Sequence, residues 1–316
     1  MPELPDLEYI RPILNQELAG KELLGLEIFE PVVLRNMLGT PVENFRGFIL
    51  DVYRHGPFLC FSLGTSSSLE SGTASTKGGA PSGKKSAGAR SKPEGAGTNP
   101  GAQCEIVIHP MLAGRFRLNG KKQSSTAVRF RFQEFHLDYL DDKKMGKVYI
   151  CSVGDVKEIP GFAKQGRDIL SDKFDREYFL KAASKSRKQV RVFIMDQSVI
   201  SSIGNAYADE ILFEAQIHPK TKMNQLNENQ KDALFVAIQS VISRGIETIQ
   251  KARPDLEMKY RDHMQVRNRK GEPCPRCGTS IRRANVLGYD SFFCPACQPD
   301  GGKGFIDWST LSQKGS

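Results

Sequence analysis

The sequence lacks three features that would place the chain in a membrane or outside the cell. It has no apolar run long enough to span a bilayer and no lipidation signal, and its first residues show no basic region followed by an apolar stretch. We therefore expect neither a membrane partner nor secretion. The expected location is an intracellular, reducing compartment, either the cytoplasm or nucleoid, or the nucleus of a eukaryotic cell.

Large apolar side chains are almost absent from residues 64–103, which consist mainly of Ser, Gly, Ala, Lys and Pro. Such a segment cannot bury enough apolar surface to offset the entropy cost of ordering it, so we predict a disordered insertion. Because strand-like patterns flank it on both sides, we interpret it as an expanded hairpin loop inside a sheet. A solvated spacer is favoured over a role in attracting phosphates through its lysines.

The charge of the chain is unbalanced, with 45 Lys and Arg against 36 Asp and Glu, a net charge of +9. This excess favours an acidic partner, with nucleic acid ahead of a membrane surface. A length of 316 residues with 39% hydrophobic residues is enough for two domains. Of the seven cysteines, Cys60, Cys104 and Cys151 lie singly in apolar, strand-like runs and are predicted core residues.

Hydrophobic periodicity predicts an α+β chain with several domains. A helix is expected over residues 6–20, kinked or shortened at Pro12. Short strand patterns recur through residues 22–63 and 104–150, and no long helices alternate with them, which favours a sandwich or flattened barrel. Helices are then predicted over residues 175–184, 188–197, 206–215 and 228–249.

The N-terminal sequence MPELPD combines a potential amine nucleophile with two acidic side chains. Removal of the initiator Met would leave Pro2 with a free secondary amine, which can form an iminium with a sugar aldehyde carbon. Glu3 stands beside it, and work on a glycosidic bond requires one group that attacks and another that protonates the ring oxygen. The same spacing is also typical of a solvated N-terminus with a helix cap, so both interpretations stay open.

Two CxxC pairs near the C-terminus have the separation of a four-thiolate zinc site. A redox CxxC would be single and would lie beside a strand–helix turn, so we expect one structural Zn²⁺ with the ligands Cys274, Cys277, Cys294 and Cys297. Four protein thiolates leave no open position for a water molecule, so the metal should fold the module and not catalyse. The residues between the pairs are typical of a hairpin with a basic strand.

Gly204 and Asn205 directly precede the predicted helix over residues 206–215, with Asn205 at the position of an N-cap. A helix N-terminus offers amide donors and a partial positive charge to a phosphate. On its own this signal is weak, because most such caps are only structural.

These three features, which follow one another along the chain as an N-terminal, a middle and a C-terminal motif, resemble the formamidopyrimidine-DNA glycosylase and endonuclease VIII family. Family chains open Pro-Glu-Leu-Pro-Glu and contain a Gly-Asn-x-Tyr-Ala sequence, which residues 204–208 match here. The resemblance implies an N-terminal antiparallel β-sandwich with a leading helix, a helix-two-turn-helix domain and a C-terminal β-hairpin zinc finger, with DNA bound between the two main domains. The implied segments are residues 1–157, 158–266 and 267–298, followed by a tail, 299–316.

The resemblance also implies an activity, a DNA glycosylase with AP lyase activity, and three catalytic residues. The amine of Pro2 would attack the anomeric carbon of a damaged nucleotide flipped out of the helix, and Glu3 would protonate the sugar ring oxygen. Asp6 stands where the family has Glu, and this shorter side chain could lose or lengthen a hydrogen bond. The implied partner is double-stranded DNA with a damaged base or an abasic site, bound by a monomer.

Four residues correspond to DNA contacts of the family: Leu112, Lys143, Asn205 and Tyr289. Leu112 replaces the Met that fills the hole left by the flipped base, so a wedge role is still expected. Lys143 replaces an Arg that reaches the orphaned base, so recognition of that base should be weaker or different. Tyr289 replaces an Arg that grips a phosphate, and a tyrosine cannot supply that charge.

A further departure, Pro57, leaves two hypotheses open. The family usually has a Lys there, which holds a phosphate and assists elimination, so that role cannot be carried over. The first hypothesis is an active glycosylase, which retention of Pro2 and Glu3 favours. The second is a DNA-binding, catalytically impaired homologue that senses lesions or DNA structure, which the changes at Pro57 and Tyr289 favour.

The apolar cluster in the tail, residues 305–308, is expected to dock on the domain surface.

Overall fold

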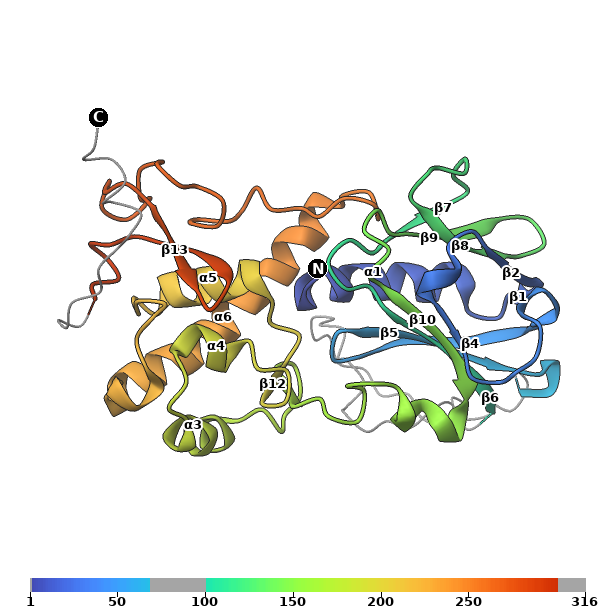
Figure 1. The fold of residues 1–316 in the computed structure, drawn as a ribbon, viewed down its shortest axis with the longest axis horizontal. Coiled ribbons are helices and arrows are strands. Elements are labelled where there is room, and N and C mark those ends of the chain that lie inside the picture. The colour runs from blue at the N-terminus through green and yellow to red at the C-terminus, as the bar shows by residue number, and fades with distance from the viewer. Residues whose placement is uncertain (1, 69–100, 301–316) are drawn as a thin grey trace, which may run out of the picture. The chain divides into compact units, whose positions relative to one another are not determined.

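The computed structural model describes residues 2–68 and 101–300, and its packing divides the chain into two compact units. The first unit comprises residues 1–164 with 253–259, and the second comprises residues 165–252 with 260–316 (Figure 1). Most of the predicted insertion lies outside the described residues, as does the tail cluster at residues 305–308.

The first unit is a β-sandwich with a leading helix, as predicted. A six-stranded sheet has the order β1-β4-β5-β6-β10-β3, and a four-stranded sheet has the order β2-β8-β9-β7. The elements are α1 (Leu4–Leu18), β1 (Glu22–Leu23), β2 (Gly25–Ile28), η1 (Pro31–Val33), β3 (Leu34–Asn36), η2 (Val42–Asn44), β4 (Gly47–His55), β5 (Phe58–Gly64), β6 (Ala102–His109), β7 (Arg115–Leu118), β8 (Thr126–Arg131), β9 (His136–Leu140), β10 (Lys147–Ser152) and η4 (Val153–Glu158).

Strand pairing in this unit departs from the antiparallel prediction at one place. The short edge strand β3 runs parallel to β10, with Leu34 opposite Val148, whereas the other neighbouring strands pair antiparallel. Strands β5 and β6 are antiparallel neighbours, with Leu59 opposite Ile108. The predicted insertion therefore does connect two adjacent strands of one sheet.

Helix α1 forms because apolar side chains recur on one face. Ile10, Leu14 and Leu18 are buried in the sandwich core. The helix continues through Pro12 to Leu18, so the expected shortening at Pro12 does not occur. Proline removes one backbone hydrogen bond from the helix, and the burial of the leucine face offsets that loss.

The six-stranded sheet has apolar side chains on both faces. Along β5, Leu59 and Phe61 point into the main core, while Phe58 and Cys60 point to the opposite face. On that face they pack with Cys151 and with residues that follow β10. Cys60 and Cys151 are therefore core residues as predicted, and Cys104 is partly buried beside the main core.

Glu105 is a fully buried carboxyl group on the same outer face of the sheet. The hydroxyl of Ser62, directly opposite on β5, donates a hydrogen bond of 2.8 Å to it. Burial raises the pKa of Glu105 to about 7, and the nearby charge of Asp51 adds to this increase. The folded protein therefore holds a proton here that the unfolded chain releases at a lower pH.

We predict that Glu105→Gln stabilises the protein more at pH 8 than at pH 5. The pKa is raised from 4.5 to about 7 on folding, so wild-type stability falls as the pH rises between these values and then stays level. The stability difference between variant and wild type should therefore grow by about 2–3 kcal/mol, measured by urea unfolding at both pH values. The matched change at the exposed Glu134, Glu134→Gln, should show no such growth. An equal difference for Glu105→Gln at both pH values would contradict the account.

The second unit contains the four predicted helices and the hairpin between the cysteine pairs. Its elements are β11 (Arg167–Asp168), α3 (Arg176–Lys185), α4 (Val190–Ile194), β12 (Ile200–Ser201), α5 (Asn205–Glu214), η5 (Met223–Gln225), α6 (Glu228–Ala252), β13 (Arg282–Val286) and β14 (Tyr289–Phe293). Helix α4 is shorter than predicted, because a turn at Asp196, whose carboxylate accepts from the backbone N–H of Ser198, follows it. Within the described ranges, no helix combines the length and the apolar character that crossing a membrane requires.

Candidate functional site

The first turn of α1 holds the N-terminal residues in a buried position. Pro2 is buried, and Glu3 and Asp6 are 4% and 5% exposed. The carboxylate of Asp6 accepts a hydrogen bond of 2.7 Å from the backbone N–H of Glu3, and the Glu3 side chain pairs in return with the backbone of Asp6. This reciprocal capping box satisfies amide donors at the helix start. Asp6, although one methylene shorter than the Glu of the resemblance, thus makes a hydrogen bond of ordinary length.

The turn between β4 and β5 is fastened to the same end of α1 by a buried ion pair. Arg54 Nε donates to Glu8 Oε1 at 2.7 Å, and its Nη1 donates to the carbonyl of Gly56 at 3.0 Å. The Arg54 side chain is only 4% exposed. Pro57 lies in this turn and is buried. Arg54, which contacts the turn at Gly56, already binds Glu8 with its guanidinium.

Strand register brings two further loops to one end of the sandwich. The loop after β6 and the loop before β10 are neighbours, since His109 pairs with Lys147 and Arg115 pairs with Leu140. The first loop exposes Leu112, which is 50% accessible, and the second exposes Met145, which is 41% accessible. Leu112, for which a wedge role is expected, and Met145 are therefore both accessible to solvent on adjacent loops.

The loop before β10 is shaped by the buried carboxylate of Asp141. This group accepts hydrogen bonds from the backbone N–H groups of Lys143 at 3.1 Å and of Gly146 at 2.6 Å. A side chain at Gly146 would collide with the hydroxyl of Tyr139, so the tight return of the chain requires glycine. As a result the side chains of Lys143 and Met145 are exposed, while the carboxylate of Asp141 fixes the backbone of the loop.

The backbone of the loop after β6 is also restrained, by hydrogen bonds at Met111 and at Leu112. Burial lowers the pKa of His109 to about 4, so its ring is neutral, and Nδ1 accepts from the backbone N–H of Met111 at 3.1 Å. Lys259 Nζ donates to the carbonyl of Leu112 at 2.6 Å. The exposed leucine is therefore presented on a constrained backbone.

In the second unit Asn205 is the first residue of α5, and Gly204 is the N-cap. The prediction that Asn205 itself is the cap was wrong, because its side chain turns to another partner. Its Oδ1 accepts a hydrogen bond of 2.8 Å from Arg191 Nη2. Tyr289 begins β14 and is 56% exposed, beside Leu287, which is 70% exposed in the hairpin turn. Sequence reasoning did not single out Leu287.

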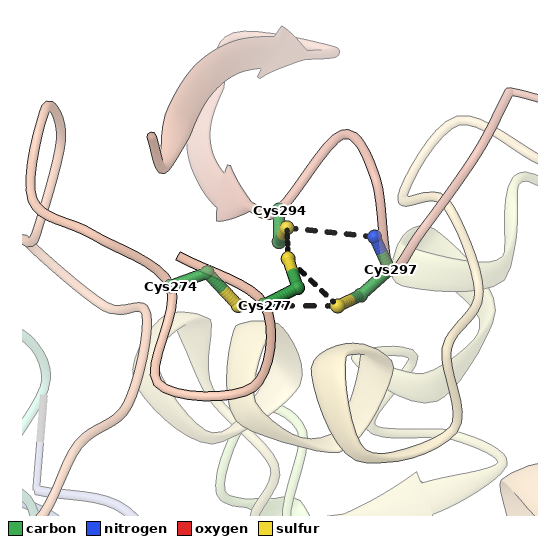
Figure 2. Close-up of side chains that lie close together, drawn as sticks. All are labelled: Cys274, Cys277, Cys294 and Cys297. Carbon is green, nitrogen blue, oxygen red and sulfur yellow. Dashed lines mark hydrogen bonds between the residues drawn. The ribbon is translucent and has the colours of Figure 1, made fainter. Parts of the chain in front are cut away.

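The four cysteine sulfur atoms form a compact cluster (Figure 2). All four lie within 4.8 Å of one another, and Cys277 Sγ is 3.5 Å from the sulfurs of Cys294 and Cys297. Tetrahedral coordination at a Zn–S distance of 2.3 Å requires sulfur separations of about 3.8 Å. Backbone N–H groups also point at sulfur, that of Arg276 at Cys274 and that of Cys297 at Cys294. The cluster fits one structural zinc ion.

This cysteine cluster is anchored on the C-terminal end of α5. Arg276, inside the first cysteine pair, donates to the carbonyl of Phe213 at 2.7 Å and to the carboxylate of Glu214 at 2.6 Å. Gln298, just after the second pair, donates to the carbonyl of Ile217 at 2.9 Å. The metal-binding module and the helix therefore form one packed body.

Three family models match successive parts of the chain. The formamidopyrimidine-DNA glycosylase N-terminal domain matches residues 1–148, the formamidopyrimidine-DNA glycosylase H2TH domain matches residues 165–253, and the zinc finger found in FPG and IleRS matches residues 271–299. The chain belongs to the formamidopyrimidine-DNA glycosylase family. The order of the matches is the order of the elements in the structure.

Relatives and solved structures agree with this family. The formamidopyrimidine-DNA glycosylase of Desulforamulus reducens is 29% identical, over 94% of this chain and 99% of its own length. The formamidopyrimidine-DNA glycosylase of Listeria innocua is 26% identical, over 94% of this chain and 100% of its own length. A crystal structure of wild-type Lactococcus lactis Fpg with DNA containing N7-benzyl-Fapy-dG has a TM-score of 0.75 at 24% identity and covers 95% of this chain and 100% of that chain. The latter likeness shows that the fold is shared.

Within this formamidopyrimidine-DNA glycosylase fold, the predicted site residues fall into two groups. Pro2, Glu3 and Asp6 meet at the start of α1, and Leu112 and Lys143 lie on the two neighbouring loops. Asn205, Tyr289 and the cysteine cluster belong to the second unit. Sequence reasoning missed the buried residues Arg54, Asp141 and Arg191. Of these three residues, only Arg191 could have been found from the sequence, because it is a charged residue inside an apolar run.

We predict that Cys294→Ala abolishes zinc binding, because a structural site needs all four thiolates. Metal analysis should find about one zinc per wild-type chain and almost none in the variant, with a lower melting temperature. Cys104→Ala removes a thiol outside the cluster and should keep the zinc. Full zinc content in Cys294→Ala would contradict the assignment of the ligands.

Proposed function

We propose that this protein is a DNA repair glycosylase with AP lyase activity that excises oxidised bases through a Schiff base at Pro2. The observation that carries the proposal is the buried first turn of α1, where Pro2 adjoins Glu3 and the Asp6 carboxylate fixes the Glu3 backbone. The curated relatives are named formamidopyrimidine-DNA glycosylases, which supports the same activity. The substrate is double-stranded DNA with a damaged base or an abasic site.

The proposed reaction needs two groups from this chain. After removal of Met1, the Pro2 nitrogen attacks C1′ of the damaged nucleotide, the N–C1′ bond forms and the bond to the base breaks. The departing base takes up a proton, and the Glu3 carboxyl group protonates the ring oxygen, so that the sugar opens. Loss of the Pro2 N–H proton frees the lone pair that forms the iminium as the bond between C1′ and the protonated ring oxygen breaks, and transfer of a C2′ proton to a base then expels the 3′ phosphate. Asp6 acts by positioning Glu3.

DNA binding is assigned to groups in both units. Leu112 and Met145 are exposed apolar side chains suited to fill the space of a flipped nucleotide, with Lys143 directed at its orphaned partner base. Asn205 and Tyr289 supply polar groups for the DNA backbone. In this proposal residues 1–157 form the catalytic domain, and residues 158–266 and 267–298 form the helix-two-turn-helix domain and zinc finger.

Two further parts of the proposal concern location and oligomeric state. The site needs reduced thiolates for zinc and DNA as the partner, so we place the protein in a reducing compartment that contains DNA. One chain carries all the assigned residues, which supports a monomer as the working unit.

The alternative function is a DNA-binding, catalytically impaired homologue that senses lesions or DNA structure. The observation that favours it is the uncharged, buried Pro57 in the turn between β4 and β5, together with Tyr289 at the hairpin. In the family a Lys and an Arg hold a phosphate, and the residues at these two positions here, Pro57 and Tyr289, carry no positive charge. Binding without efficient strand cleavage would follow.

The two functions are separated by borohydride trapping on a duplex with one abasic site. For the glycosylase we expect a covalent protein–DNA adduct with wild-type protein, lost or relocated in Pro2→Gly. Glu3→Gln should reduce release of a damaged base by about 10²–10⁴-fold, the typical contribution of an acid–base group. Tight DNA binding with no adduct, from protein with a verified free Pro2 amine, would instead establish the sensor function.

We also predict that Tyr289→Arg restores a phosphate contact. The position is exposed, so the substitution should not disturb folding. One new phosphate contact steepens the dependence of log binding constant on log salt by about 0.9. Fluorescence anisotropy at several salt concentrations would measure this slope, with Tyr260→Arg as a control for added charge in the same unit. An unchanged slope for Tyr289→Arg would exclude a phosphate near the hairpin tip.

A further inference from the structure

Arg191 is the largest charged side chain in the described part of the molecule that is almost completely buried. It is 1% exposed and lies on the short helix α4. Its planar guanidinium donates to three acceptors, namely Asp209 Oδ1 at 3.2 Å, Asn205 Oδ1 at 2.8 Å and the carbonyl oxygen of Asp290 at 3.1 Å. One side chain therefore joins α4, the start of α5 and the zinc-finger hairpin.

The charge of Arg191 is balanced by Asp209, which is fully buried on α5. Asp209 also accepts from Arg267 Nη1 at 2.7 Å and from Ser291 Oγ at 2.7 Å. Arg267 in turn donates to the carbonyl oxygen of Asp290 at 3.0 Å. Because every partner is fixed, the guanidinium has little freedom to turn away from Asn205.

The contact with Arg191 decides which way the Asn205 amide faces. A guanidinium is only a donor, so it fixes the amide oxygen on its own side and leaves the amide nitrogen on the other. Among the described residues, Asn205 Nδ2 donates to no acceptor, and the side chain is half-buried at the first position of α5. Two N–H donors are thereby held beside the positive end of a helix, where an anionic oxygen is favoured.

We propose that Arg191 is a positioning residue for DNA binding: it orients Asn205 so that Nδ2 donates to a DNA phosphate, and it ties this donor to the zinc-finger hairpin through Asp290. The inference rests on the proposed function, in which Asn205 contacts the DNA backbone. Lysine could balance the charge of Asp209, but its ammonium group lacks the planar fork that reaches Asn205 and Asp290 together.

The test is a double-substitution cycle on binding to a duplex with one abasic site. Asn205→Ala should weaken binding about 10- to 100-fold, the range for a hydrogen bond to a charged group. Arg191→Lys should weaken it about tenfold, and should have almost no further effect when Asn205 is already Ala. Because Arg191 itself touches no phosphate in this account, Arg191→Lys should leave the salt dependence of binding unchanged.

Two controls distinguish positioning from loss of structure. Ser291→Ala removes a hydrogen bond to Asp209 without touching the bond between Arg191 and Asn205, so it should lower the melting temperature but not the affinity. Arg176→Lys makes the same chemical change in the exposed pair with Asp232 and should alter neither. Affinity losses that simply follow the melting temperatures across the variants would overturn the proposal.

A second measurement needs no Arg191 variant and serves if Arg191→Lys does not fold. Nuclear magnetic resonance of the wild-type protein should show the Asn205 side-chain amide protons shifting when the duplex is added, and no shift would overturn the proposal. The outcomes also distinguish failure of the proposed function from failure of the role proposed for Arg191. If wild-type protein does not bind the duplex, the proposed function fails. If Asn205→Ala weakens binding but the effects of the two substitutions add, only the role of Arg191 fails.

Discussion

The hydrogen bond between the Asp6 carboxylate and the Glu3 backbone is the interaction on which the catalytic account depends. A chain terminus is ordinarily mobile, and a mobile amine would make a poor nucleophile. Here the capping box fixes the first turn of α1, and Leu4 and Leu7 in that turn are fully buried. The ion pair between Arg54 and Glu8 then fastens the β4–β5 turn to the same helix. Pro2, the proposed nucleophile, and Glu3, the proposed acid, are thus attached to a turn that these contacts hold in place.

Buried charges perform a common task elsewhere in the molecule. Asp141 holds a loop through backbone N–H groups, and Asp209 joins two arginines across α4, α5 and the hairpin. Such groups cost stability unless every partner is present, so each one specifies a single local arrangement. Lys143 and Tyr289, the proposed contacts to DNA, are exposed side chains. A substitution at either position would therefore alter the proposed contacts to DNA without altering the fold.

The parts of the fold that could be predicted from the sequence are those with local signals. The two CxxC pairs, the periodicity of α1 and α6, and the interpretation of the insertion as a connection between adjacent strands depend on neighbouring residues only, and each agrees with the structure. The bounds of short strands such as β3 and β9 could not be predicted within the strand-like ranges, since a few residues carry too little periodicity.

Residues whose partners are distant in the sequence could not be predicted. Arg54 and Glu8 are 46 positions apart, and Arg191 and Asp290 are 99 positions apart, so only the fold reveals these contacts. Asn205 was misplaced as a cap for the same reason, because its preference for Arg191 over the helix backbone is a tertiary effect. The helix through Pro12 is another case in which burial outweighs a local rule.

The most direct test of the central claim is to locate the covalent bond between protein and DNA. Wild-type protein would be reduced with borohydride on abasic DNA, digested, and the modified peptide sequenced by tandem mass spectrometry. We expect the sugar remnant to be attached to the nitrogen of Pro2, at the start of a chain that has lost Met1. Attachment to a lysine side chain in wild-type protein, with Pro2 unmodified, would contradict it.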